Sequence, residues 1–161
     1  MTSVLFVCLG NICRSPTAEA VFRQKAANAS LKTHIESAGT SGAHQGEPPD
    51  RRSMAAGQCR GYSFKGQTSR RVTRSDFLAF DYILAMDKSN LSNLMRVRDQ
   101  LLREDPDSNP AMPKRFLEYA QGEGEIDVPD PYYGGPMGFD HVLDLIEAAS
   151  DGLIAEIAAN T

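Results

Sequence analysis

The sequence contains little cysteine and no long apolar stretch. Three cysteines in 161 residues are an odd and small number for a fold held together by disulfides. None of them lies in a Cys-x-x-Cys pair or in a Cys/His cluster with metal spacing. No apolar stretch reaches the roughly 18 residues that indicate a transmembrane helix. These absences argue against a disulfide scaffold, a zinc module and a membrane-spanning helix, and they favour thiol chemistry.

The sequence also lacks an excess of positive charge and a secretory signal. It has 17 basic and 21 acidic side chains, a formal net charge of −4, so we expect it to bind neither nucleic acid nor a membrane. The first three residues lack the basic segment and the cleavage site of a secretory signal. We therefore expect a cytoplasmic protein that holds any anionic ligand in a local site.

Short apolar segments alternate with helical patterns, without internal repeats or low-complexity linkers. This alternation predicts a single α/β domain over residues 1–161, built on a parallel sheet. The expected strands are 4–7, 34–38, 80–86 and a possible one at 115–119, and the expected helices are 15–29, 50–61, 88–98 and 142–157. Ser15 is expected to cap the first helix and Asp87 the third, whereas Gly152 should weaken the last one.

Between the first strand and the first helix, Cys8 and Arg14 are separated by five residues. Such a segment can curl so that its backbone N–H groups point inward at the positive end of the helix dipole, where an anion binds. Gly10 and Asn11 suit this loop because both tolerate positive φ angles. Arg14 can hold two phosphate oxygens with its planar guanidinium. The pattern predicts an anion-binding loop.

The same loop can support phosphoryl transfer. The N–H dipoles that favour phosphate also favour a nucleophilic thiolate on Cys8, and Ser15 can donate a hydrogen bond to it. A ring of such donors can stabilise the transition state without a metal or another cofactor. The reaction also needs a carboxyl group that protonates the leaving oxygen and then activates water. The candidates on late loops are Asp105, Asp107, Asp127 and Asp130, of which only Asp130 has adjacent aromatic residues.

Residues 8–15 together with Pro16 resemble the signature of the low-molecular-weight protein tyrosine phosphatase family. The similarity covers nearly the whole chain and includes residues 37–41, 49–50, 80–87 and 130–134. It implies a four-stranded, doubly wound parallel sheet with helices on both faces and a site at the carboxyl ends of the strands. It also implies hydrolysis of phosphotyrosine in proteins, and of aryl phosphomonoesters, through a phosphocysteine on Cys8.

The resemblance assigns roles to individual residues. Asp130 corresponds to the general acid, which later acts as the base, and Tyr132 and Tyr133 would stack against the phenyl ring of the substrate. Phosphate or another oxyanion would bind to the loop residues Leu9, Gly10, Asn11, Ile12, Cys13 and Ser15. Supporting residues would be Asp87 and a hydrogen-bonded network that joins Asn11 to Glu19, Ser41 and Gln67.

Of three further positions, two leave alternatives open. Ile12 would contact the substrate ring, and it argues against the arginine-phosphatase branch of the fold, which resembles this chain but carries threonine there. His44 replaces part of a rim that is aromatic in many family members, and it is either solvated or in contact with substrate. Cys13 either packs as a small residue or forms a reversible disulfide with Cys8, as the resemblance implies for members that have both.

Two other functions compete with the phosphatase. An arsenate reductase shares the fold and the loop, but it needs downstream resolving cysteines, and only Cys59 lies beyond the loop. A non-catalytic phosphate-binding module would keep Arg14 but would not need both Cys8 and Asp130. Turnover separates these hypotheses.

Overall fold

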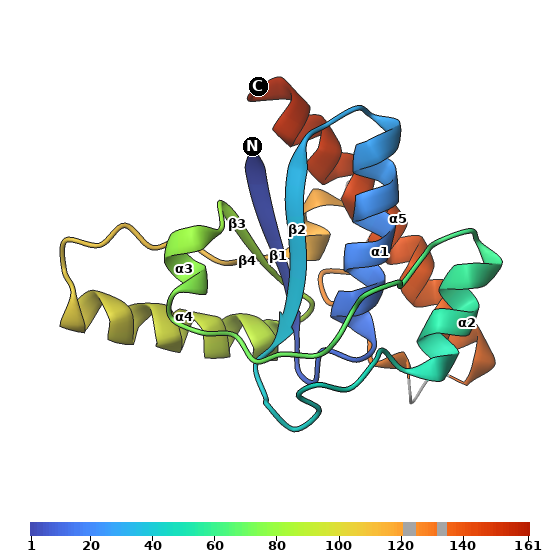
Figure 1. Cartoon of the computed structure of the whole chain (residues 1–161), viewed down its shortest axis with the longest axis horizontal. Coiled ribbons are helices and arrows are strands. Elements are labelled where there is room, and N and C mark those ends of the chain that lie inside the picture. Colours follow the sequence, from blue (N-terminus) through green and yellow to red (C-terminus); the bar gives the residue numbers. More distant parts are fainter. Residues whose placement is uncertain (121–124, 132–134) are drawn as a thin grey trace.

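The structure is a computed structural model that describes residues 1–120, 125–131 and 135–161. Each of its strands is followed by a helix along the chain (Figure 1). In order, they are β1 (Thr2–Cys8), α1 (Arg14–Asn28), β2 (Thr33–Gly39), α2 (Arg51–Cys59), α3 (Asp76–Ala79), β3 (Tyr82–Ala85), α4 (Lys88–Glu104), β4 (Lys114–Arg115), the 3₁₀ helix η1 (Phe116–Tyr119) and α5 (Pro136–Ala159).

The sheet has four parallel strands in the order β2-β1-β3-β4. Helices α1 and α5 pack together on one side of it, and α3 and α4 lie on the other (Figure 1). The predicted α/β fold with a four-stranded parallel sheet between helices is therefore confirmed. Within the described ranges, no helix has the length and apolar character that a membrane crossing requires.

Alternation along β1 divides the core between the two faces. Val4 and Phe6 belong to the cluster beneath α1 and α5, whereas Leu5 and Val7 belong to the cluster beneath α3 and α4. All four are fully buried. Burying each such side chain contributes about 1.5–3 kcal/mol, so β1 is a central element of both cores. This double burial anchors β1 between the two cores, with Cys8 at its carboxyl end.

Several element boundaries differ from the predictions. Helix α1 begins at Arg14 with Cys13 at the N-cap position, so Ser15 lies inside the helix and does not cap it. The predicted cap at Asp87 is confirmed, but α4 continues to Glu104, beyond the expected end at Arg98. The last strand has only two residues because the chain turns into η1 at Phe116.

Gly152 has a packing role that the sequence does not reveal. A Cβ atom at this position would lie 1.9 Å from the carbonyl oxygen of Tyr119 in η1. The glycine therefore allows α5 to pack directly against the backbone of η1. Glycine in a helix costs about 1 kcal/mol relative to alanine, but it allows the close packing between α5 and η1.

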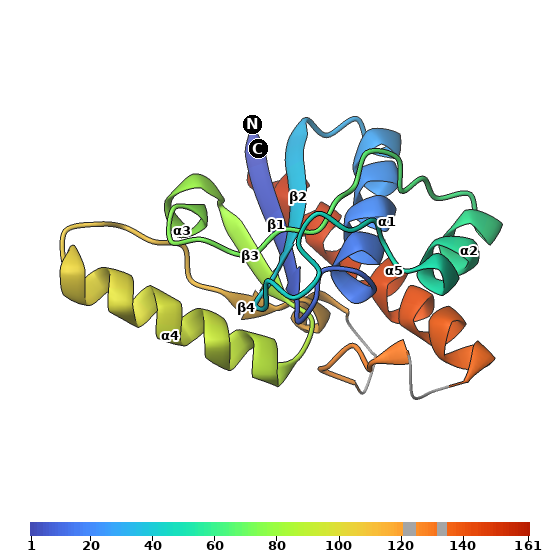
Figure 2. The same cartoon turned by 60° about the horizontal axis from the view of Figure 1, so that its bottom comes forward.

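The carboxyl ends of β1, β2 and β3 meet at one end of the sheet. Cys8 ends β1, Gly39 ends β2, and Asp87 follows β3 by two residues. The loop after β1 and the start of α4 lie side by side at this end in both views (Figures 1 and 2). A Cβ atom on Gly39 would lie 2.8 Å from the carbonyl oxygen of Leu9, so glycine allows the loop to approach β2 closely.

Candidate active site

Asn11 holds the loop between β1 and α1 in its curved form. Its backbone adopts φ 57°, a left-handed conformation, and it is 2% exposed. Its side-chain Nδ2 donates to the hydroxyls of Ser15 and Ser37, each at 2.9 Å, and its Oδ1 accepts from the backbone N–H of Arg70 at 3.0 Å. The hydroxyl of Ser69 donates to the Asn11 carbonyl at 2.7 Å. Asn11 thus ties the loop to β2 and to the segment after α2.

Cys8 lies at the base of the loop and is 3% exposed. Its Sγ atom is 3.0 Å from Oγ of Ser15 and accepts from the backbone N–H of Asn11 at 3.2 Å. Both groups can donate to a thiolate at this position. The inward placement of Ser15 also explains why it does not cap α1.

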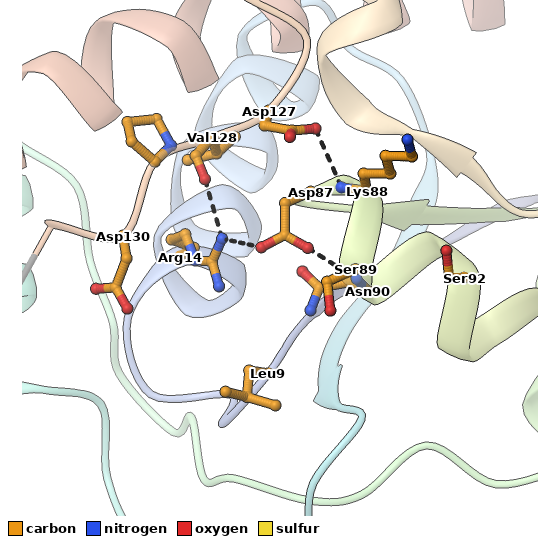
Figure 3. Close-up of a pocket in the computed structure, with 11 residues that line it drawn as sticks. Leu9, Arg14, Asp87, Lys88, Ser89, Asn90, Ser92, Asp127, Val128 and Asp130 are labelled. Carbon is orange, nitrogen blue, oxygen red and sulfur yellow. Dashed lines mark hydrogen bonds and ion pairs between the residues drawn. The ribbon is translucent and has the colours of Figure 1, made fainter.

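Asp87 orients Arg14 towards the loop. Arg14 Nη1 donates to Asp87 Oδ2 at 2.6 Å and to the carbonyl oxygen of Val128 at 2.9 Å (Figure 3). The other carboxylate oxygen of Asp87 accepts from the backbone N–H of Asn90 and caps α4. Because the two hydrogens of Nη1 serve these contacts, Nε and Nη2 of the guanidinium remain for two oxygens of a ligand.

The supporting network differs from the predicted one. Ser37, which was not among the predicted residues, links Asn11 to Glu19, because its hydroxyl donates to Glu19 Oε1 at 2.8 Å. The hydroxyl of Ser41 instead accepts from the backbone N–H of Ala43. Gln67 Nε2 donates to the carbonyl oxygen of Pro16 at 3.1 Å. The network prediction is therefore wrong for Ser41 and Gln67, whose contacts lie elsewhere.

The loop opens into a pocket of about 210 Å³. Cys8, Arg14 and Asp130 line it together, so the structure brings the three predicted catalytic residues to one cavity. Leu9, Gly10, Ile12, Cys13 and Ser41 also line it. Tyr132 and Tyr133 lie outside the described residues.

His44 and Cys13, for which the sequence leaves alternatives, also lie at this pocket. His44 lines it, and its Nδ1 is 2.8 Å from Glu47 Oε2. Cys13 is buried and lines the same pocket as Cys8. Cys59 is exposed and is not among the residues that line the pocket.

A second hollow of about 700 Å³ adjoins the first (Figure 3). The two share Leu9, Arg14 and Asp130. Figure 3 shows Arg14, held by Asp87 and Val128, next to this hollow, with Lys88 and Ser92 of α4 on its far side.

Comparison with known proteins identifies the family. Residues 3–161 match the model of the family described as low molecular weight phosphotyrosine protein phosphatase. The low molecular weight protein-tyrosine-phosphatase YfkJ of Bacillus subtilis is 43% identical over 159 residues, which cover 98% of this chain and 96% of the relative. The fold also matches the crystal structure of a protein tyrosine phosphatase from Entamoeba histolytica, with TM-score 0.89, 38% identity and 99% of both chains covered.

The arginine phosphatase DARP of Drosophila has a similar structure, with TM-score 0.85, 28% identity and 98% of both chains covered. The full-length family match and the higher identity to the tyrosine phosphatases agree with the geometry of the loop. The chain therefore belongs to the low molecular weight phosphotyrosine protein phosphatase family.

Proposed function

We propose that this protein hydrolyses phosphotyrosine in proteins, and other aryl phosphomonoesters, through a covalent phosphocysteine on Cys8. The observation that carries the proposal is the meeting of Cys8, Arg14 and Asp130 in one pocket. A thiol, a guanidinium and a carboxyl group there can supply the nucleophile, the oxyanion clamp and the proton donor.

In the first step, the Cys8 thiolate attacks phosphorus. The S–P bond forms while the P–O bond to the phenyl ring breaks, and Asp130 gives its proton to the leaving oxygen. Arg14 and the loop N–H groups bind the equatorial oxygens, where negative charge is spread in the transition state. The position of Arg14 is set by Asp87 and Val128, so the guanidinium needs little reorganisation when charge develops.

In the second step, the Asp130 carboxylate takes a proton from water, and the water oxygen attacks phosphorus. The S–P bond breaks and inorganic phosphate is released. Ser15 Oγ, 3.0 Å from the sulfur, donates to the thiolate as it leaves. The residues in these steps complete a cycle without a metal or other cofactor.

The pocket lining supports an aryl phosphate over the competing substrates. Ile12 presents an apolar side chain to the pocket, which suits a phenyl ring better than a guanidinium group. Cys59, the candidate resolving thiol of an arsenate reductase, does not line the pocket. We propose phosphotyrosine proteins as the substrates and the cytoplasm as the location, and we expect no role for nucleic acid or a membrane.

Turnover of two substrates with different leaving groups, measured in excess chelator, tests the mechanism. We expect metal-independent hydrolysis that is lost in Cys8→Ser. In Asp130→Ala, hydrolysis of phenyl phosphate should fall more than that of p-nitrophenyl phosphate, because the poorer leaving group depends more on protonation. Asp107→Ala removes another exposed carboxylate from a late loop, so it is the matched control and should leave both rates unchanged.

Activity that persists in Cys8→Ser would refute the phosphocysteine mechanism. Binding of phosphate without any turnover by the wild type would favour the non-catalytic module. Equal losses for the two substrates in Asp130→Ala would remove Asp130 as the acid.

A further inference from the structure

Three hollows, each sharing lining residues with the next, lead from the active site along α4. The hollow of about 700 Å³ shares Leu9, Arg14 and Asp130 with the catalytic pocket. A third hollow, of about 590 Å³, shares Lys88 and Ser92 with the second. We call the second and third hollows together the α4 groove.

The far part of the α4 groove is basic. Lys88, Arg96 and Arg115 line the third hollow together with one acidic residue, Asp99. Arg115 lies 3.6 Å from Asp127, whereas Lys88 and Arg96 are exposed and have no ion pair with the described part of the chain. This local excess of positive charge contrasts with the net charge of −4 for the whole chain. It suits an anionic partner.

The near part of the groove carries the proposed general acid Asp130 and two further acidic residues, Asp87 and Asp127, that are engaged in contacts within the protein. Asp87 binds Arg14 and caps α4. Asp127 accepts from the backbone N–H of Lys88 at 3.0 Å and pairs with Arg115. The unpaired cations that an acidic ligand can reach are therefore Lys88, where the second and third hollows meet, and Arg96 in the third hollow.

The dimensions of the groove set how many residues separate the phosphotyrosine from the acidic side chains of a bound peptide. A cube with the volume of the second hollow, about 700 Å³, has an edge of about 9 Å, the length of about three residues of extended chain. Lys88 and Arg96 are eight positions apart on α4, or about 12 Å, which an extended peptide spans with about four residues. Acidic side chains roughly three to seven residues from the phosphotyrosine would then face these cations.

We propose that the α4 groove binds an acidic segment of the phosphoprotein substrate, about three to seven residues to one side of the phosphotyrosine. This inference rests on the proposed function and adds a substrate class to it. The continuity of the groove with the catalytic pocket and the unpaired cations of α4 support it. Because these contacts lie far from the reacting phosphorus, they act on substrate binding and so on KM.

Matched phosphotyrosine peptides test the proposal. One pair carries glutamate or glutamine at the third to seventh residue before the phosphotyrosine, and a second pair carries them after it. We expect kcat/KM for one glutamate peptide to exceed that for its glutamine partner by about 5- to 10-fold, the effect of one to two exposed ion pairs. The other pair should show no such difference.

Two charge reversals on α4 locate the effect. Arg96→Glu should abolish the preference for the glutamate peptide. Arg103→Glu makes the same change on an exposed residue of the same helix that lines none of the three hollows, and it should retain the preference. Hydrolysis of p-nitrophenyl phosphate, which is too small to reach α4, should be unchanged in both variants.

Equal kcat/KM for the glutamate and glutamine peptides of both pairs would overturn the proposal. An equal loss of preference in Arg96→Glu and Arg103→Glu would also overturn it, because that result would attribute the preference to the overall electrostatic field of the protein. Fluorescence anisotropy of the same labelled peptides with Cys8→Ser measures docking without turnover. A failure of p-nitrophenyl phosphate hydrolysis would contradict the proposed function alone, whereas equal binding of the four peptides would contradict docking alone.

Discussion

Replacing Asn11 by alanine should destabilise the protein and disorganise the anion-binding loop. Alanine removes the side-chain contacts to Ser15, Ser37 and the Arg70 N–H while leaving a backbone at φ 57°. A buried donor or acceptor left unsatisfied costs about 1–3 kcal/mol. Holding alanine in the left-handed region adds about 1–2 kcal/mol. The expected loss in the free energy of unfolding is therefore about 2–5 kcal/mol.

Glycine at position 11 separates the two contributions. It removes the same side-chain contacts but tolerates the positive φ, so Asn11→Gly should be more stable than Asn11→Ala by about 1 kcal/mol. Urea denaturation at neutral pH measures the three free energies of unfolding. The kcat/KM for p-nitrophenyl phosphate should fall in both variants, because the N–H of residue 11 also donates to Cys8.

Two results would refute this account of Asn11. The first is an alanine variant whose free energy of unfolding is within about 0.5 kcal/mol of wild type, since surface changes without structural consequence stay within that range. The second is a glycine variant less stable than the alanine variant, which would mean that the left-handed backbone is not retained in the folded protein.

Three further perturbations test other parts of the structure. Asp87→Ala should lower kcat/KM about 10- to 150-fold, equivalent to the 1.5–3 kcal/mol of a charged hydrogen bond. Loss of the α4 cap should also lower the free energy of unfolding by about 1 kcal/mol, measured by thermal unfolding. Unchanged kinetics would contradict the role of Asp87. Gly152→Ala should destabilise despite its better helix propensity of about 1 kcal/mol, because the Tyr119 carbonyl lies 1.9 Å from the new Cβ; a stabilised variant in urea would contradict this packing. Burial and Glu156 raise the pKa of Tyr119 above its usual 10.0, so the protonated tyrosine favours the folded state. The free energy of unfolding should therefore fall as pH rises above 10, and it should fall less in Tyr119→Phe. Identical alkaline unfolding curves for the two proteins would refute the assignment.

Those features that depend on local pattern could be predicted from the sequence. The apolar segment before Cys8 and the helical pattern after Ser15 predict the strand, loop and helix that carry the site. The five-residue spacing to Arg14 is confirmed as a loop that joins these elements, and the family assignment is confirmed by the match over residues 3–161. Such features can be predicted because each depends on residues that are close together in the sequence.

Contacts between distant segments could not be predicted in the same way. Ser37 and Arg70 reach Asn11 only because β2 and the segment after α2 lie beside the loop, and no local pattern indicates that proximity. A serine on the predicted second strand, within the segment that resembles the family, was the one available signal for Ser37. The packing role of Gly152 could not be predicted for the same reason, since its partner in η1 is distant in the sequence.

Trapping the phosphoryl group on Cys8 is the direct test of the proposed phosphocysteine mechanism. Asp130→Ala, mixed with p-nitrophenyl phosphate and quenched rapidly in acid, would be digested and analysed by mass spectrometry, with Cys8→Ser as the control. The account predicts one phosphoryl group on the peptide that contains Cys8, attached to its sulfur and absent from the control. Turnover with the phosphoryl group on another residue, or with none on Cys8 at any quench time, would contradict it.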